Sequence, residues 1–348
     1  MEKVEKHAKQ TGTDPTKAFA PTGARVRVTF AARIAEAILI HAGTDKIHDK
    51  HLILHYNCEW RQDLSEQTNA IIAGRKTFFI QPDISLFPEN FCEEYLMNGF
   101  ECYFVENVRK FPLDVYIDYL VETFKDLILF FNIDSPDPGE PWSIFIRKLH
   151  KKHEGKLLIG VLYTKRQNRE EKALLEKTYL FNIGIPCGCI QLEYQKKTNF
   201  GIIEKVLYAN QAMGRRKQVR ALCNNNSTLS FVFNKNTYTA NLQDVSLSHF
   251  SFSLPKGQLK MPLYEKVTGI HMAVKGCHIR TNAVLFMSRP IHDDTEDLFV
   301  FMFVGYNGQQ GLEETTKQTL LPKLYKMMYE NCMSLLADVV KEAHLTRI

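Results

Sequence analysis

Two short groups of residues have types and a spacing suited to binding a phosphorylated purine. The first is Gly214-Arg215-Arg216-Lys217-Gln218-Val219-Arg220, in which Arg216 and Arg220 lie four positions apart. An arginine side chain can hold a phosphate with two parallel hydrogen bonds, stack flat on a purine and match the O6/N7 edge of guanine. This segment therefore predicts recognition of phosphate and guanine.

The second group is Asp244-Val245-Ser246-Leu247-Ser248-His249, which follows after enough chain for a strand hairpin. Asp244 can accept hydrogen bonds from guanine N–H groups, and Ser246 can donate to a phosphate or fix a turn. Each group alone has a simpler interpretation, because a basic run is usually a solvated linker and Asp-x-Ser is a common turn signature. Their order, at the start of a β-barrel pattern, favours one joint binding site.

The pair resembles the motifs of the PilZ family, Arg-x-x-x-Arg followed by Asp/Asn-x-Ser-x-x-Gly, separated by the first strands of a small barrel. Arg216 and Arg220 match the arginines, and Asp244 and Ser246 match the second motif. The resemblance covers residues 214–348 and implies binding of the bacterial second messenger cyclic di-GMP. The predicted ligand-binding residues are Arg215, Arg216, Arg220, Asp244, Ser246 and His249.

One residue departs from the family pattern, because His249 stands where the motif has glycine. A glycine allows a positive φ or a close approach of the backbone to a ligand. Histidine adds a side chain beside the ligand, so His249 either weakens binding or stacks on a base. The sequence leaves both alternatives open.

The elements around these residues are strand-like segments without helical connectors. They lie at 229–233, 238–242, 250–254, 271–274, 283–287 and 298–304. This rhythm predicts an antiparallel β-barrel. Gly311 then opens a long helix with one apolar stripe, which core packing or a homodimer seam explains better than a membrane. Residues 214–348 are thus predicted to form a PilZ-like barrel with a long C-terminal helix.

Upstream, apolar strand runs alternate with amphipathic helices over residues 76–213. This alternation predicts a doubly wound parallel sheet. The segment resembles the receiver domain of two-component systems, because 126–130 is similar to its third strand and Thr164 matches the hydroxyl after the fourth. The predicted fold is therefore multidomain, an α/β receiver-like domain followed by a β-barrel domain.

The receiver-like segment lacks most of the chemistry of phosphotransfer. That reaction needs a carboxylate ending the third strand, acidic metal ligands after the first and a lysine after the fifth. Phe131 occupies the phosphoacceptor position, Asp83 is a lone acid, and Glu193 and Gln195 surround the place of the lysine. The segment is therefore predicted to be a degenerate receiver that serves as a docking or dimerisation surface.

A shifted strand register leaves a second interpretation of this segment. Asn132 or Asp134 could then take the phosphoacceptor place. Acidic residues after a strand are more often only solvated, so the degenerate interpretation is preferred.

The first 75 residues give no clear function. Residues 1–23 are polar and are predicted to be a flexible arm, and residues 24–75 a small α+β extension. This extension holds a cluster of metal-ligand types, His48, His51, His55 and Cys58. A buried strand with histidines at its edges is the simpler interpretation, so no metal and no cofactor is predicted.

Bulk composition limits the classes of function. The chain has 348 residues, which predicts two or three domains, and its net charge of +5 does not favour binding of a nucleic acid polymer. No run approaches the ~18 apolar residues that span a bilayer, and no secretory signal is evident. The 8 cysteines show no paired framework, which favours a soluble protein of the reducing cytoplasm.

These observations predict a non-enzymatic sensor that binds cyclic di-GMP between its second and third parts and changes their arrangement. The partner that receives the signal is an unknown protein, and motility is a process that such domains often regulate. The first alternative is a degenerate PilZ-like module that binds only protein, with His249 blocking the pocket. A nucleotide hydrolase is a second alternative, but no phosphate-cradling glycine loop or nucleophile–base motif supports it.

Overall fold

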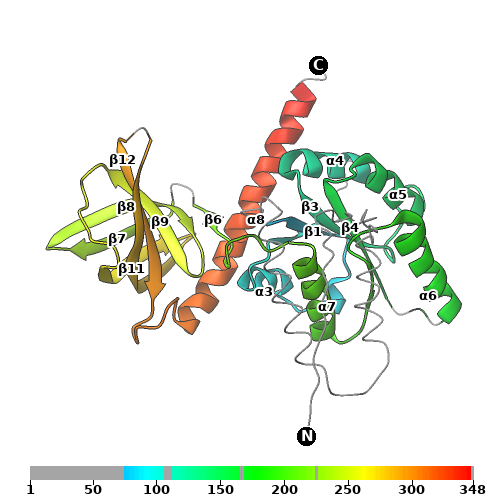
Figure 1. Cartoon of the computed structure of the whole chain (residues 1–348), viewed down its shortest axis with the longest axis horizontal. Helices are drawn as coiled ribbons and strands as arrows, with labels where there is room; N and C mark the ends of the chain where they lie inside the picture. Colours follow the sequence, from blue (N-terminus) through cyan, green and yellow to red (C-terminus); the bar gives the residue numbers. More distant parts are fainter. Residues whose placement is uncertain are drawn as a thin grey trace, which may run out of the picture. The chain divides into compact units, whose positions relative to one another are not determined.

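A computed structural model describes residues 74–105, 112–164, 166, 168–223, 226–292 and 294–345. The predicted arm 1–23 and nearly all of the predicted extension 24–75 lie outside the described residues. The cluster of His48, His51, His55 and Cys58 lies outside them as well. The described residues form one parallel and one antiparallel sheet with their helices (Figure 1).

The first sheet is parallel throughout and has the strand order β2-β1-β3-β4-β5. Its strands are β1 (Lys76–Ile80), β2 (Cys102–Val105), β3 (Leu127–Asn132), β4 (Leu157–Thr164) and β5 (Cys189–Leu192). This order is that of flavodoxin-like doubly wound folds. All six residues of β3 are buried, as expected for a central strand covered on both faces. The predicted doubly wound sheet is confirmed.

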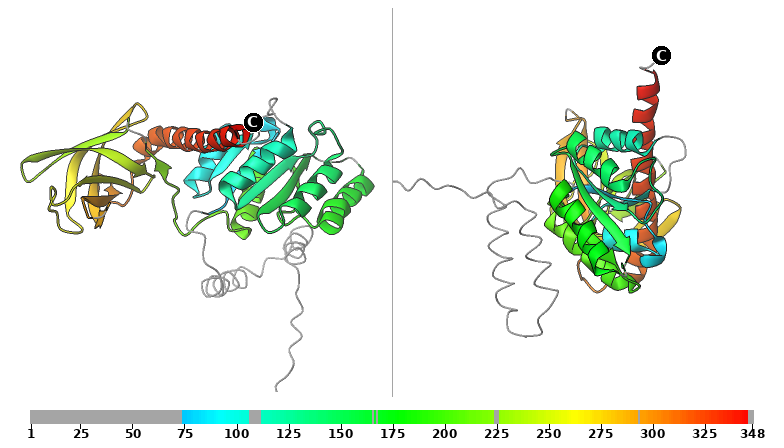
Figure 2. Two further views of the ribbon diagram at one scale, coloured as in Figure 1. Left: turned by 90° about the horizontal axis from the view of Figure 1, so that it is seen from above. Right: turned by 90° about the vertical axis from the view of Figure 1, so that its right-hand side faces the viewer.

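Helices cover both faces of this sheet (Figure 2). One face packs against α4 (Leu113–Phe124), α5 (Trp142–Lys152) and the π-helical η2 (Lys177–Ile183). The other packs against α3 (Phe91–Met97) and α7 (Lys196–Ala209). One of the helical segments is two elements, because α6 (Arg169–Glu176) continues directly into η2, which ends at the left-handed Gly184.

The second sheet closes into an antiparallel barrel. Its strands are β6 (Ala221–Leu222), β7 (Thr228–Phe233), β8 (Asn236–Val245), β9 (His249–Pro255), β10 (Lys266–Val274), β11 (Cys277–Ile291) and β12 (Glu296–Val304). The order is β6-β8-β7-β10-β11-β12-β9, and β9 also pairs with β8. That last pairing closes β7 to β12 into a ring, to which β6 adds at β8. The predicted barrel is confirmed.

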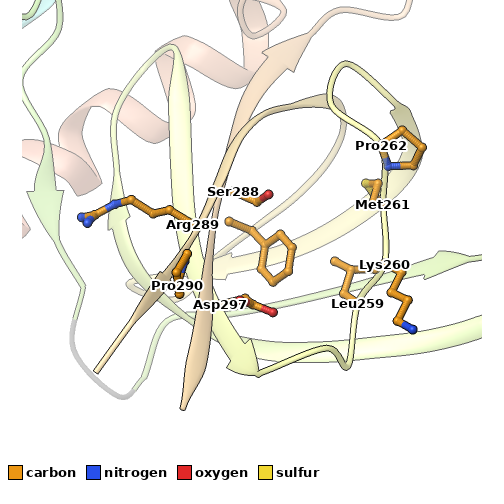
Figure 3. A pocket seen from close by; sticks show the side chains of 9 residues that line it. Leu259, Lys260, Met261, Pro262, Ser288, Arg289, Pro290 and Asp297 are labelled. Atoms are coloured by element: carbon orange, nitrogen blue, oxygen red, sulfur yellow. The ribbon is translucent and has the colours of Figure 1, made fainter. Parts of the chain in front are cut away.

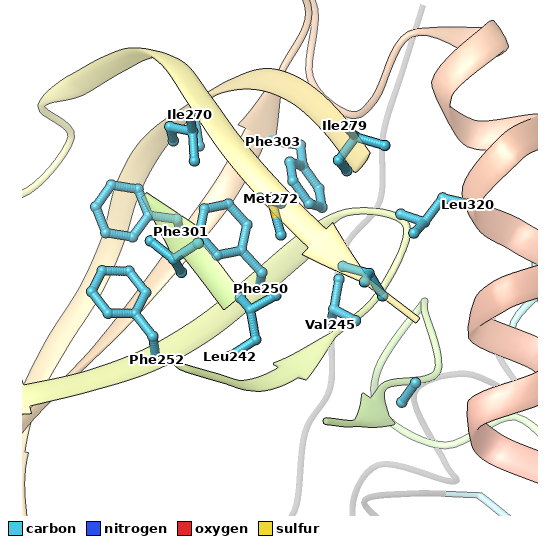
Figure 4. Packing of buried hydrophobic residues seen from close by; sticks show 14 of the residues in the cluster. Leu242, Val245, Phe250, Phe252, Ile270, Met272, Ile279, Phe301, Phe303 and Leu320 are labelled. Atoms are coloured by element: carbon cyan, nitrogen blue, oxygen red, sulfur yellow. The ribbon is translucent and has the colours of Figure 1, made fainter. Parts of the chain in front are cut away.

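Four phenylalanines at alternate positions of two neighbouring strands form the centre of the barrel core. Phe250, Phe252, Phe301 and Phe303 are at most 1% exposed, and the Phe250 and Phe301 ring centroids lie 5.5 Å apart (Figure 4). Successive strand residues point to opposite faces, so this period of two directs the rings inward.

The long helix α8 (Glu314–Leu345) contributes buried residues to the hydrophobic core of the barrel and to the core on one face of the parallel sheet. Leu320, Leu324 and Met328 pack into the barrel core, and Leu320 points from the helix toward the strands (Figure 4). Cys332 and Leu336 continue the same spacing of four and pack into the core beside the parallel sheet. The predicted boundary between the two domains, 76–213 and 214–348, stays a prediction, because α8 packs into the barrel core and also into a core of the parallel sheet. Within the described ranges, no helix has the length and apolarity required to cross a membrane.

Candidate functional site

The arginine segment is brought to the Asp-x-Ser motif by strand pairing. Residues 210–220 connect α7 to β6, and β6 pairs antiparallel with the end of β8. In this register Ala221 lies opposite Val245 and Leu222 opposite Asp244. Arg220, directly ahead of β6, is therefore placed beside residues 244–246.

Arg220 and Asp244 form an ion pair in which Nη1 lies 3.5 Å from Oδ2. The two side chains are 27% and 18% exposed, so the pair is largely shielded from solvent. The second carboxylate oxygen, Oδ1 of Asp244, is buried and has no hydrogen-bond partner among the described residues. Asp244 thus keeps one free acceptor. It lies in β8 rather than in the turn that the sequence suggests.

Ser246 fixes the turn between β8 and β9. Its Oγ accepts hydrogen bonds from the backbone N–H groups of His249 at 3.0 Å and Ser248 at 3.3 Å. The backbone N–H of Ser246 donates to the His249 carbonyl at 2.8 Å. The Ser246 hydroxyl is thus engaged with the turn, and its donation to a phosphate stays a prediction.

His249, which replaces the motif glycine, begins β9 and does not have a positive φ. The conformational freedom of glycine is therefore not needed here. The imidazole Nδ1 lies 2.8 Å from the Ser248 Oγ, and the ring meets Phe286 edge-on at 5.3 Å between centroids. Burial and then the neighbouring Arg220 lower the pKa of His249, while Asp244 acts in the opposite direction. These effects favour a neutral ring.

Four of the six predicted site residues line one cavity of about 470 Å³. They are Arg216, Arg220, Ser246 and His249. Asp244 is next to this cavity through its ion pair with Arg220. Arg215 is exposed and does not line it. The structure thus brings together both halves of the predicted motif pair, with Arg215 left outside.

The sequence did not identify several residues that complete the cavity. Met302 lies opposite His249 in the β12–β9 pairing, and Gln310 and Gly311 come from the loop before α8. This loop is held by a bridge between Gln310 and Val304. The pattern Gln-Gln-Gly before the helix marks a loop, but only the fold places that loop beside the arginine segment.

A smaller cavity of about 190 Å³ lies on another side of the arginine segment and shares Arg216 and Arg220 with the first. It is also lined by Lys76, Glu101 and Tyr103. The Glu101 carboxylate is buried, pairs with Lys76 and accepts a hydrogen bond from the Tyr103 hydroxyl. The two arginines therefore line one cavity beside the barrel strands and another beside the parallel sheet.

Phe131 stands at the position that the receiver resemblance assigns to the phosphoacceptor. Phe131 is fully buried and packs against Trp142 and Phe145. Thr164 is the residue that the resemblance matches to the receiver hydroxyl. Its backbone N–H (2.6 Å) and its Oγ1 (2.7 Å) both donate to the Asp134 carboxylate. Arg166 pairs with the other oxygen of that carboxylate.

The remaining receiver positions have structural roles. Asp83 caps the short helix η1 (Ile84–Leu86) by accepting from the Ser85 backbone N–H at 3.0 Å. Asn132 is 8% exposed, and its Nδ2 donates to the Gln81 carbonyl at 3.0 Å, which ties β3 to β1. The backbone N–H of Glu193 donates to Asn199, and the Glu193 side chain is exposed. The side chains of Asp83 and Asn132 thus already have partners within the fold.

All seven cysteines in the described part of the chain are free thiols. Burial raises the pKa of Cys92 and Cys332 to about 12, so these thiols stay protonated. Among the described residues, no group of three or more His, Cys, Asp or Glu side chains is arranged to hold a metal ion.

Among known proteins, this chain is similar to several solved structures. No protein-family model and no curated protein matches the chain. The Bacillus subtilis inhibitor of motility MotI/DgrA matches with 13% identity over 33% of this chain and 52% of that one, at a TM-score of 0.28. Escherichia coli YcgR in complex with c-di-GMP (cyclic di-GMP) matches with 17% identity over 37% and 51%, at a TM-score of 0.30.

The PilZ domain of YcgR with c-di-GMP matches with 13% identity over 37% of this chain and 98% of that domain, at a TM-score of 0.24. The chain spans about half the length of the MotI/DgrA chain and of the YcgR chain in the c-di-GMP complex. Each of the three matches covers about a third of this chain.

Proposed function

We propose that this chain binds cyclic di-GMP in the cavity beside the arginine segment and acts as a non-enzymatic sensor. One observation supports this most strongly: Arg216 and Arg220 line the same cavity as Ser246 and His249, which come from a separate motif. A volume of about 470 Å³ is within the ordinary range for small-molecule sites.

The two arginines supply the charge that a doubly phosphorylated ligand needs. Arg216 is exposed and forms no ion pair with another described residue, so its guanidinium is available to a phosphate. Arg220 is held at 3.5 Å by Asp244, a distance at the long end for a hydrogen bond. A phosphate in the cavity competes with Asp244 for this guanidinium.

Asp244 is suited to reading the guanine. Its Oδ1 has no partner among the described residues, and its Oδ2 is released when Arg220 turns to a phosphate. A carboxylate with free acceptors can bind the N–H groups of a guanine edge. Adenine presents a different edge, so we assign selectivity for guanine to Asp244.

His249 provides an aromatic wall rather than a block. The pKa of His249 is lowered, chiefly by burial, which favours the neutral ring, and Phe286 contacts this ring edge-on. Neutral aromatic rings stack on purines. The His249 ring can therefore contribute to binding at the position where the motif has glycine. Ser246 is a positioning residue in this proposal, because its hydroxyl holds the turn that carries His249.

Signalling to a protein partner follows from the shared position of the arginines. Arg216 and Arg220 also line the smaller cavity with Lys76 and Glu101, so their capture by a ligand changes contacts beside the parallel sheet. We propose that this shift alters the arrangement of the barrel and the receiver-like part. A cytoplasmic location is inferred from the cysteines, which show no paired framework, and a role in motility rests on the family resemblance alone.

Thermal unfolding with and without cyclic di-GMP tests binding. A ligand that binds only the folded state stabilises it by RT ln(1 + [L]/Kd), so the melting temperature should rise with ligand concentration. Cyclic di-AMP serves as the matched control ligand, and the nucleotide recovered afterwards should be intact. An unchanged melting temperature at saturating concentrations supports the alternative, a module that binds only protein.

A further inference from the structure

The outer face of the barrel holds a second cavity of about 580 Å³ that shares no residue with the arginine cavity. Strands β7, β10 and β11 form its floor, and the loop after β12 contributes Tyr306. Its polar lining consists mostly of hydrogen-bond donors, among them Lys266, His271, Arg280 and Asn282. We call this cavity, with these four side chains and Tyr306, the basic groove.

Strand register aligns the groove residues along the sheet. Ser230, His271 and Arg280 form one row across β7, β10 and β11, because His271 lies opposite both of the others. Lys266 lies five residues before His271 on β10. The Arg280 guanidinium lies over Gly269, between these two positions, so the two permanent positive charges lie along the same stretch of β10.

A bulge in β10 creates room for the arginine. The β10–β11 register shifts between Val267 and Ile270, and Gly269 has a φ of +67°. This positive φ favours glycine, and a Cβ at Gly269 would lie 3.3 Å from Arg280 Nη2, which shows that the guanidinium lies over the strand at this position. The Gly269 backbone N–H donates to Asn282 Oδ1 at 3.0 Å, which fixes the bulge.

The donors of the groove lack acceptors. Asn282 is only 5% exposed, and its Nδ2 donates to no described residue. Neither Lys266 nor Arg280 pairs with a carboxylate among the described residues, whereas Lys256 pairs with Asp294 elsewhere on the barrel. No Asp or Glu lines the groove. Clustered cationic side chains without a carboxylate partner favour an anionic ligand.

A comparable cavity on the same barrel does not share these properties. It measures about 500 Å³ and includes the carboxylate of Asp297. Its two cations, Lys260 and Arg289, extend in different directions (Figure 3). The basic groove is the better candidate because its cations face no acid in their own cavity.

We propose that the basic groove binds an extended acidic segment of a partner protein. Carboxylates spaced along the segment would pair with Arg280 and Lys266, and an apolar side chain would pack on Tyr306 and Val232, each 60% exposed. Nucleic acid fits less well, because duplex DNA carries a charge about every 1.7 Å of its axis and two permanent cations in the groove lining match few of its phosphates. This proposal names a partner chemistry and does not depend on nucleotide binding.

Fluorescence anisotropy with the full chain tests this proposal. The probe is a labelled peptide of about seven residues that alternates glutamate with valine, which places its carboxylates on one face of an extended strand. The double variant Lys266→Glu/Arg280→Glu should weaken binding about tenfold, and added salt should weaken binding to the wild type. A peptide with lysine in place of glutamate should not bind.

The control variant is Arg289→Glu, which reverses one charge of the same barrel outside the groove and should leave binding unchanged. Equal peptide affinity in all variants, or tight binding of single-stranded DNA without binding of the peptide, would overturn the proposal. The double variant should bind cyclic di-GMP as the wild type does, so a failure here is distinguishable from a failure of the nucleotide site.

Discussion

Arg220 Nη1 lies 3.5 Å from Asp244 Oδ2, and this contact joins two sequence motifs that are 24 positions apart. The pairing of β6 with the end of β8 makes the contact, since Leu222 lies opposite Asp244. Arg220 also lines both cavities beside the arginine segment. The Arg220 guanidinium can therefore pair with Asp244 when the cavity is empty and with a phosphate when the ligand is bound.

Asp244→Asn should lower the affinity for cyclic di-GMP about tenfold, because a carboxylate acceptor for guanine N–H groups is lost. It should also reduce the preference for cyclic di-GMP over cyclic di-AMP, which competition binding measures. Asp294→Asn removes an exposed carboxylate of the same barrel and is the matched control. Unchanged selectivity in Asp244→Asn would show that another group reads the base.

Ser246→Ala should lower the free energy of unfolding by about 1–2 kcal/mol, because two backbone N–H groups of the turn lose their shared acceptor. Urea unfolding measures this change, and Ser288→Ala, on the exposed part of β11, should have little effect. If Ser246→Ala keeps full stability and loses only nucleotide affinity, Ser246 contacts the ligand directly and its positioning role is wrong.

Acidification should destabilise the fold through His249. Its pKa is lowered from the ordinary value of 6.5, chiefly by burial, so folding favours the neutral ring. The contribution of His249 is then complete above pH 6.5 and is lost as the pH falls toward and through the lower folded-state pKa. The free energy of unfolding should depend less on pH in His249→Gln than in the wild type.

His278→Gln, which changes an exposed histidine of β11, is the control for this titration and should follow the wild type. Identical pH dependence in His249→Gln and the wild type would mean that the fold does not hold the His249 ring neutral.

Incubation with acetyl phosphate and Mg²⁺ should not phosphorylate the receiver-like part. Phe131 is in the core, and the carboxylate of Asp134 is engaged by Thr164 and Arg166. Intact-mass spectrometry should show no added phosphoryl group, while an active receiver domain treated in parallel should gain one. Stoichiometric labelling of this chain would contradict the degenerate interpretation.

The sequence predicts both sheets because their signals are local. A central parallel strand such as β3 (Leu127–Asn132) is buried on both faces and therefore continuously apolar. The barrel strands alternate with a period of two, as Phe250 and Phe252 show. The motif spacing also identifies Arg216, Arg220 and His249, which the structure brings to one cavity.

Features that depend on tertiary contacts could not be predicted. The strand predicted at 283–287 is part of the longer β11 (Cys277–Ile291), in which the polar residues Arg280 and Asn282 contact Gly269 in the β10 bulge. Phe286 occupies a register shift between Leu285 and Met287, so its contact with His249 has no local signal. Helical periodicity likewise does not reveal that α8 serves two cores.

Calorimetric titration of cyclic di-GMP tests the central claim most directly. The wild type should show saturable binding, and Arg216→Ala and Arg220→Ala should each weaken it about 10- to 100-fold, as expected for a lost charge-assisted hydrogen bond. Arg215→Ala should bind almost as the wild type does, because Arg215 does not line the cavity. Absence of binding to the wild type, or equal affinity in all three variants, would contradict the account.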